Sequence, residues 1–63
     1  MSYREAKELA QLRQVLRDGL SSADVRGVSP ALERLREFAV SDSDLRAEYD
    51  RWAFRFELIS VAA

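Results

Sequence analysis

Pairs of carboxylates are the groups in this sequence whose spacing comes nearest to a catalytic site. Asp42 and Asp44 lie two residues apart, as do Glu48 and Asp50. Residues two apart on a helix do not face each other, so neither pair resembles an acid/base dyad or a cage for a hard cation. The chain has no His, no Cys and one Lys, which removes the usual nucleophile and base pairs and most transition-metal sites. We therefore predict that the protein is not an enzyme and has no catalytic, metal-binding or cofactor-binding residue.

The aromatic-rich stretch 45–61 carries side chains suited to recognition of another protein. Trp, Tyr and Arg are enriched among the residues that dominate binding at protein interfaces, and here aromatic residues are interleaved with arginines. One apolar set repeats every three or four residues, so it forms one seam that the rest of a small bundle can cover: Leu45, Tyr49, Trp52, Phe56 and Ile59. A second apolar set lies on another side, where two short helices cannot reach it: Phe54, Leu58 and Val61. We predict that the partner-binding residues are Phe54, Leu58, Val61, Arg51, Arg55 and Trp52.

Length and composition also favour a protein that works through a partner. A chain of 63 residues makes at most one small domain of marginal stability, and without Cys and His it has neither disulfides nor a zinc site to reinforce it. We therefore expect a homo-oligomer or a complex with a target chain. The net charge of −1 with well-mixed signs disfavours nucleic acid as the partner. Charges near the N-terminus and the absence of an apolar run of about 18 residues predict a cytoplasmic protein that does not enter a membrane.

Capping signals and helical periodicity predict the elements that position these residues. Ser2 to Glu5 fits a capping box, so a first helix is expected over 3–19, with Gly19 ending it in the left-handed conformation. The segment 21–29 is predicted to be a loop, in which Asp24 or Ser22 could cap a short turn. Four leucines form a seam on the first helix, which either packs within the bundle or contacts a partner: Leu9, Leu12, Leu16 and Leu20.

Two further helices are predicted after the loop. Ser29 followed by Pro30 is a strong helix start, which gives a helix over 30–40. A third helix over 44–60, capped by Ser41 or Ser43, would carry the aromatic stretch. The predicted fold is therefore all-α, a single domain over 1–63 with a helical hairpin and an aromatic-rich C-terminal helix. Apolar residues also alternate beyond Trp52, so a strand that pairs with another chain is the alternative there.

The leucine-rich segment 9–22 resembles the toxin-binding region of ParD-type antitoxins. That family repeats the pattern L-x-x-L-R-x-x-I/L-x-E/D-G-L-x-S-G, which is filled here by Leu9, Leu12, Arg13, Leu16, Asp18, Gly19, Leu20 and Ser22. The resemblance implies an amphipathic helix that wraps around a ParE/RelE-type toxin. This chain departs from the family because it leaves no room for the ribbon–helix–helix domain that binds DNA and because it continues into the aromatic stretch.

Together these patterns predict a non-enzymatic protein–protein interaction module, which acts as a small inhibitor, antitoxin-like protein or adaptor. The alternative is a minimal helix-turn-helix regulator that binds DNA, because the second and third predicted helices have its outline. Its recognition helix would then present Asp44, Glu48 and Asp50 to the phosphates, and this charge disfavours DNA.

Overall fold

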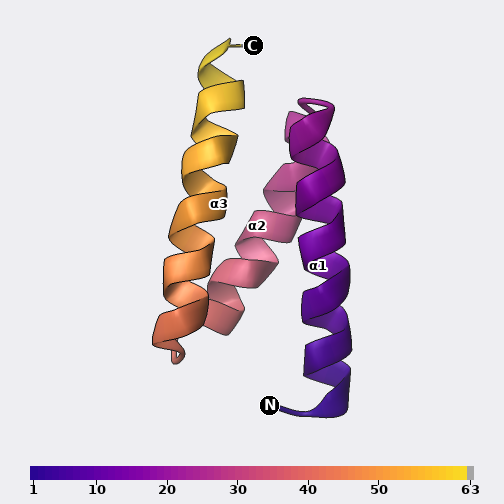
Figure 1. Ribbon diagram of the computed structural model, residues 1–63, viewed down its shortest axis with the longest axis vertical. Coiled ribbons are helices and arrows are strands. Elements are labelled where there is room, and N and C mark those ends of the chain that lie inside the picture. Colours follow the sequence, from indigo (N-terminus) through magenta and orange to yellow (C-terminus); the bar gives the residue numbers. More distant parts are fainter. Residues whose placement is uncertain (63) are drawn as a thin grey trace.

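Three helices account for almost all of the described chain. The computed structural model describes residues 1–62, which form α1 (Tyr3–Ser21), α2 (Val25–Ala39) and α3 (Ser43–Ala62). In Figure 1, α1 and α3 run in the same direction, and α2 returns obliquely between them in the opposite direction. Residues 1–62 contain no strand, so the predicted all-α, three-helix fold is confirmed. The alternative of a strand beyond Trp52 is wrong, because residues 52–62 continue α3.

The start of α1 follows the capping box predicted from the sequence. The Ser2 hydroxyl accepts a hydrogen bond from the Glu5 amide at 3.2 Å, and the Glu5 carboxylate accepts one from the Ser2 amide at 3.3 Å. Both contacts satisfy amides that have no partner inside the helix. The predicted N-terminal boundary is therefore correct.

The end of α1 differs from the prediction at Gly19. The helix continues to Ser21, and the residue with positive φ is Ala23, at 55°, whereas neither glycine has a positive φ. The Asp24 amide donates to the Gly19 carbonyl at 2.8 Å, and the Ala23 amide donates to the Leu20 carbonyl at 3.3 Å. These two bonds form a Schellman motif, in which Ala23 takes the position that usually belongs to glycine.

Replacing Ala23 with glycine is expected to raise the free energy of unfolding by about 0.5–1 kcal/mol. The left-handed conformation strains an alanine Cβ, and glycine removes that strain at a smaller cost in the entropy of the unfolded chain. Urea unfolding followed by circular dichroism measures the change. Loss of stability in Ala23→Gly would contradict the left-handed assignment.

Helix α2 begins at Val25, five residues before the predicted start at Pro30, and the segment 25–29 is helix where a loop was predicted. Asp24 is the cap, since its carboxylate accepts from the Gly27 amide at 3.1 Å. Pro30 lies inside the helix and lacks the amide that would bond to the Arg26 carbonyl. The complete burial of Val28 against α1 holds this first turn in place despite the proline. Burial therefore outweighs the local preference of the Ser-Pro pair.

The start of α3 is capped by Asp42, where the sequence had suggested Ser41 or Ser43. One oxygen of the Asp42 carboxylate accepts from the amides of Asp44 at 3.0 Å and Leu45 at 3.1 Å. The Asp42 carbonyl accepts from the Arg46 amide at 2.9 Å and so closes the first helical turn. An aspartate at this place also complements the positive end of the helix dipole.

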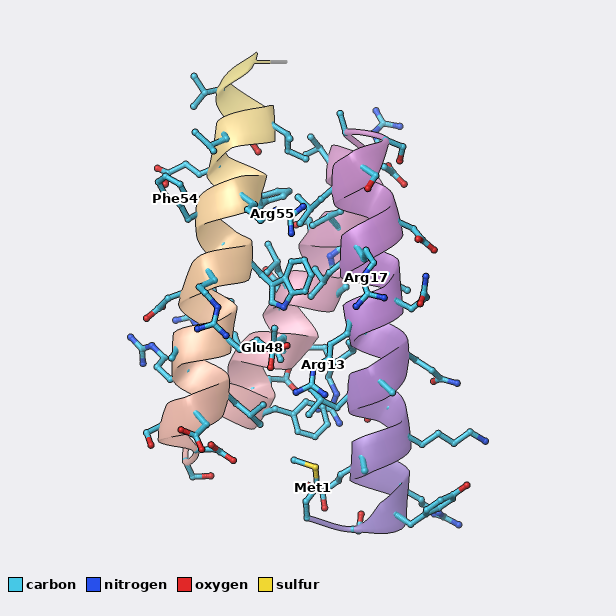
Figure 2. The ribbon with its side chains drawn as sticks, in the orientation of Figure 1. Met1, Arg13, Arg17, Glu48, Phe54 and Arg55 are labelled. Atoms are coloured by element: carbon cyan, nitrogen blue, oxygen red, sulfur yellow. The ribbon has the colours of Figure 1, made fainter. Side chains whose placement is uncertain are left out.

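The core lies where α2 packs between the other two helices, and side chains from all three converge there in Figure 2. Buried leucines of α1 pack on apolar residues of α2, and Leu16, Val28 and Leu35 have no exposed area. Gly19 makes the close approach possible, because a Cβ at this position would lie 2.4 Å from a Val28 methyl carbon. The remaining buried residues are Leu9, Leu20, Ala31, Leu32, Ala39 and Leu45.

Candidate protein interface

The two apolar sides of α3 have different surroundings. Leu45 is buried in the core, and four partly buried residues of the same seam pack against it: Tyr49, Trp52, Phe56 and Ile59. The other side, which we call the outer face, consists of Phe54, Leu58 and Val61, with exposed fractions of 61%, 56% and 83%. Phe54 points away from α1 in Figure 2. The division of α3 into a core side and an exposed apolar side therefore agrees with the helical spacing.

Charged residues border the outer face in an asymmetric pattern. Given the helical period, Asp50 and Glu57 lie along one edge and Arg51 and Arg55 along the other. All four are exposed. Asp50 also forms an ion pair with Arg46 at 3.6 Å, and both of these side chains are mostly in solvent. An apolar stripe between an acidic and a basic edge has the composition of a helix that packs against another helix.

Trp52, which was grouped with the partner-binding residues, lies on the core side of α3. It packs against the core, and its indole N–H donates to the Glu48 carboxylate at 3.1 Å. Arg55 lies over the Trp52 ring, with 5.2 Å from the guanidinium carbon to the ring centroid. The structure thus brings Arg55 and Trp52 together, while Phe54, Leu58 and Val61 form a separate surface.

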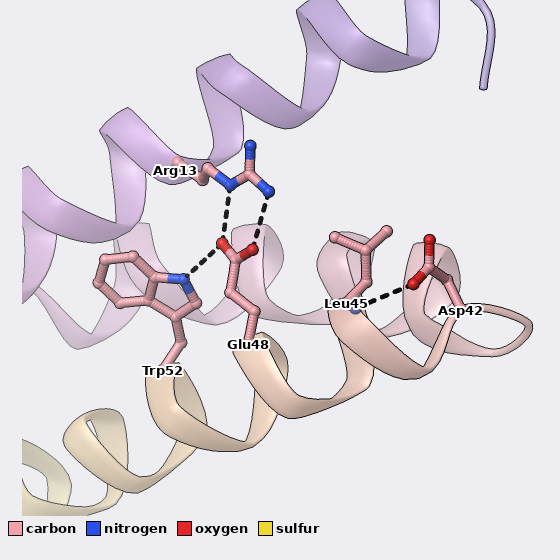
Figure 3. Close-up of polar contacts among 5 residues, drawn as sticks. All are labelled: Arg13, Asp42, Leu45, Glu48 and Trp52. Carbon is pink, nitrogen blue, oxygen red and sulfur yellow. Dashed lines mark hydrogen bonds and ion pairs between the residues drawn. The ribbon is translucent and has the colours of Figure 1, made fainter.

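A polar cluster that the sequence did not predict joins α1 to α3. The Arg13 guanidinium donates to both oxygens of Glu48, at 2.7 and 2.8 Å, in the bidentate arrangement shown in Figure 3. The Glu48 side chain is 17% exposed and that of Arg13 is 40% exposed. The hydrogen bonds from Arg13 hold the pKa of Glu48 below its usual value, the Trp52 N–H acts in the same direction, and partial burial opposes both. The same contact raises the pKa of Arg13.

A second polar cluster joins α1 to α2 at the surface. Arg34 binds the carboxylate of Glu8, with one of the two contacts at 3.0 Å, and also pairs with Glu37 one turn along its own helix. Its guanidinium lies 4.8 Å from the centroid of the Phe38 ring. The pairing of Arg34 with Glu37 is the one expected from the i,i+3 spacing, whereas the contact with Glu8 has no local signal. The pKa of Glu8 is lowered by the Arg34 hydrogen bond.

The leucine seam of α1 is occupied by the chain itself. Leu9, Leu16 and Leu20 are buried, and Leu12 is partly buried against the same core. Packing within the bundle is therefore the role these residues have in this structure. A toxin-like partner could reach them only after α1 had separated from α2.

A hollow at the C-terminal end of α2 is lined by Glu33, Arg36, Glu37 and Val40, all of which are exposed, so it is not an enclosed site. Within residues 1–62 there is no group of three acidic, His or Cys residues that could hold a metal ion. None of α1, α2 and α3 is both long and apolar enough to cross a membrane. Comparison with known proteins found no matching family model, no matching curated protein and no matching solved structure. The outer face of α3 is therefore the surface that we consider for a function.

Proposed function

We propose that this protein is a non-enzymatic interaction module that binds another protein chain through the outer face of α3. The observation that supports this proposal is the exposure of Phe54, Leu58 and Val61 on one side of a continuous helix. Both other helices pack on the core side of α3, and no residue of α1 or α2 belongs to this face. Apolar side chains grouped in this way favour association, because a partner removes them from water.

The binding energy of such a face would centre on Phe54. It is the largest side chain of the three and is 61% exposed, so it offers the most apolar area for a partner to bury. Arg51 and Arg55 are placed at its edge, where arginine makes ion pairs and packs its aliphatic stem over apolar surface. In this role the protein would act as an adaptor or as an inhibitor that occupies a groove of its target.

An antitoxin-like role is a narrower form of the same proposal. The ParD resemblance concerns the seam of α1, and that seam packs on α2. Toxin binding in the manner of that family would therefore require α1 to open away from Leu32 and Leu35. Binding through the outer face of α3 requires no such opening, so we place the partner on α3.

Replacing Phe54 with serine is expected to weaken association at least about tenfold while leaving the helical content and the melting temperature nearly unchanged. The phenyl ring is mostly in solvent, so its removal costs the isolated fold little. Circular dichroism measures the fold. Association is measured by the amount of protein that the immobilised chain captures from a lysate of its native host. Tyr3→Ser is the matched control, because Tyr3 is exposed at the far end of α1. Unfolding of Phe54→Ser, or equal capture by both variants, would overturn the proposal.

DNA binding is the alternative function, and its test is independent. Electrophoretic mobility of random duplex DNA at low salt is expected to be unchanged at micromolar protein, because acidic side chains lie on the exposed sides of α3. A clear shift would favour the DNA-binding regulator over the interaction module.

A further inference from the structure

The outer face of α3 belongs to a seven-residue repeat, which also includes the neighbouring residues Ala47 and Arg51 and which we call the seam. Ala47, Phe54 and Val61 recur at intervals of seven, and Arg51 and Leu58 do the same in the neighbouring column. All five residues are exposed, although the same helix buries its other side in the bundle. In heptad notation Arg51 and Leu58 are at a, and Ala47, Phe54 and Val61 are at d. This is the pattern of a helix that packs along its length against another helix.

The charges beside this seam indicate what kind of helix fits. Asp50 and Glu57 occupy g positions, and Arg55 occupies the following e position. In a parallel pair of identical helices, each g residue meets the e residue five places later on the other helix. Asp50 of one chain then lies beside Arg55 of the second copy, and the two-fold symmetry repeats this ion pair. The chain is therefore complementary to itself in the parallel orientation.

The antiparallel orientation gives the opposite result. There each g edge lies beside the other g edge, so that Asp50 approaches Glu57 of the second copy. Like charges at such distances repel and disfavour the arrangement. On the e edges Arg55 approaches Glu48, but the Glu48 carboxylate is already bound by Arg13 and Trp52 within its own chain. The acidic and basic edges of α3 thus select one orientation of a self-complex and oppose the other.

Between Ala47 and Val61 the seam holds one charged residue, Arg51, and Asp44 extends the same column by one heptad towards the N-terminus of α3. At both of these a positions like charges meet across the two-fold axis, which limits the strength of the pairing. A charged or polar residue at a single a position lowers stability and also fixes the register and the number of helices. In the parallel register Arg51 lies next to Asp50 of the second copy, and its long stem can carry the guanidinium to the edge. The seam covers only two heptads, so the resulting dimer is weak and depends on concentration.

We propose that the outer face of α3 binds the same face of a second copy, and that the two α3 helices lie parallel and in register with Asp50 paired to Arg55 across a two-fold axis. This inference rests on the proposed function, since it names the partner of the same face. In the single chain, Asp50 forms an exposed ion pair with Arg46, and Arg55 stacks on the Trp52 ring. Both contacts are at the surface and can be exchanged for contacts across the dimer.

Sedimentation equilibrium on the full chain tests the dimer. We expect the average mass to rise from one chain towards two between about 5 µM and about 1 mM at low ionic strength, where exposed ion pairs are least screened. Phe54→Ser is expected to lower the association constant at least about tenfold. A mass of one chain throughout this range, or an unchanged association constant in Phe54→Ser, overturns the inference.

Charge reversal tests the orientation. Asp50→Arg is expected to weaken a parallel dimer roughly fivefold, because two attractive pairs become repulsive. The double variant Asp50→Arg with Arg55→Asp is expected to restore association to within about twofold of the original chain. A higher association constant in Asp50→Arg would indicate the antiparallel pair and overturn the inference. An unchanged association constant in this variant would also overturn it.

Glu57→Arg is the matched control for charge. Glu57→Arg changes the net charge by the same amount as Asp50→Arg and on the same edge of α3. In the parallel register, however, position 57 meets the e position 62 of the second copy, where the sequence has no charge. We expect an association constant within about twofold of the original, whereas an antiparallel dimer would be strengthened.

If the chain stays monomeric but Phe54→Ser still loses capture of another protein, this inference fails and the proposed function stands. If Phe54→Ser unfolds, the proposed function itself fails.

Discussion

Gly19→Ala is expected to lower the free energy of unfolding by about 1–3 kcal/mol, although alanine is the better helix former by about 1 kcal/mol. A Cβ at position 19 would lie 2.4 Å from a methyl carbon of Val28, which is far inside van der Waals contact. Val28 is fully buried and β-branched, so it cannot rotate away without disturbing its other neighbours. Either α2 must move off α1 or the valine must leave its preferred rotamer. For a domain of this size the loss is a large part of the total stability.

Urea unfolding of a double-mutant cycle measures this contact. Val28→Ala removes the methyl group that Gly19→Ala would strike, so the double variant is expected to lose less stability than the sum of the two single variants. Gly27→Ala is the control. The atoms nearest to its Cβ would be those of the Asp24 carboxylate, so the substitution disturbs the cap of α2 and not a core side chain. The weaker cap is offset by the better helix propensity of alanine, and we expect a net loss below about 1 kcal/mol. Equal losses at the two glycines, or strict additivity in the cycle, would show that close packing at Gly19 is not the cause.

The Gly19 contact also shows why part of the fold could not be predicted from the sequence. A glycine after a leucine-rich helix usually ends that helix, and Ser29 with Pro30 usually starts the next one. Both local preferences were misleading here, because Val28 packs into the space over Gly19 and extends α2 back to Asp24. The left-handed residue is Ala23, which no local preference favours. These boundaries depend on contacts between helices, which the order of residues does not reveal.

The division of α3 into two sides was predictable for a different reason. Helical spacing alone separates the seam that begins at Leu45 from the outer face that begins at Phe54. Burial follows this division closely, with Leu45 in the core and Phe54 mostly in solvent. The helical state beyond Trp52 was less certain in the sequence, because the same residues also alternate in the manner of a strand.

The Arg13–Glu48 contact illustrates what periodicity cannot supply. Its partners are separated by 35 positions, and neither residue has a neighbour in the sequence that marks the pair. In the sequence, Glu48 is notable as the neighbour of Asp50 in a carboxylate pair and as one of three acidic residues that disfavour DNA binding. Its place on the core side of α3, one turn before Trp52, becomes informative only when α1 is known to lie opposite.

Glu48→Gln is expected to lower the free energy of unfolding by about 1–2 kcal/mol at neutral pH. The substitution keeps the shape of the side chain but removes the charge that accepts two hydrogen bonds from Arg13 and one from Trp52. The loss is moderate because Arg13 is 40% exposed and can be rehydrated, whereas Glu48 is 17% exposed. Trp52 fluorescence is a local readout, since the indole N–H loses its charged acceptor. An unchanged stability and an unchanged emission maximum would mean that the contact does not hold α1 to α3.

The pH dependence of stability gives a second measure of the same contact. The pKa of Glu48 is lower in the folded chain than in the unfolded chain, so its contribution is complete above the unfolded value of about 4.3 and is lost as the pH falls through the lower, folded value. The original chain should therefore lose stability on acidification in this window, and Glu48→Gln should lose less. Glu8 has a pKa lowered in the same direction by Arg34, so Glu8→Gln is the matched control. Because Glu8 is more exposed, we expect Glu8→Gln to flatten the acid slope less than Glu48→Gln does. If both variants kept the acid slope of the original chain, the acid sensitivity would lie in other carboxylates.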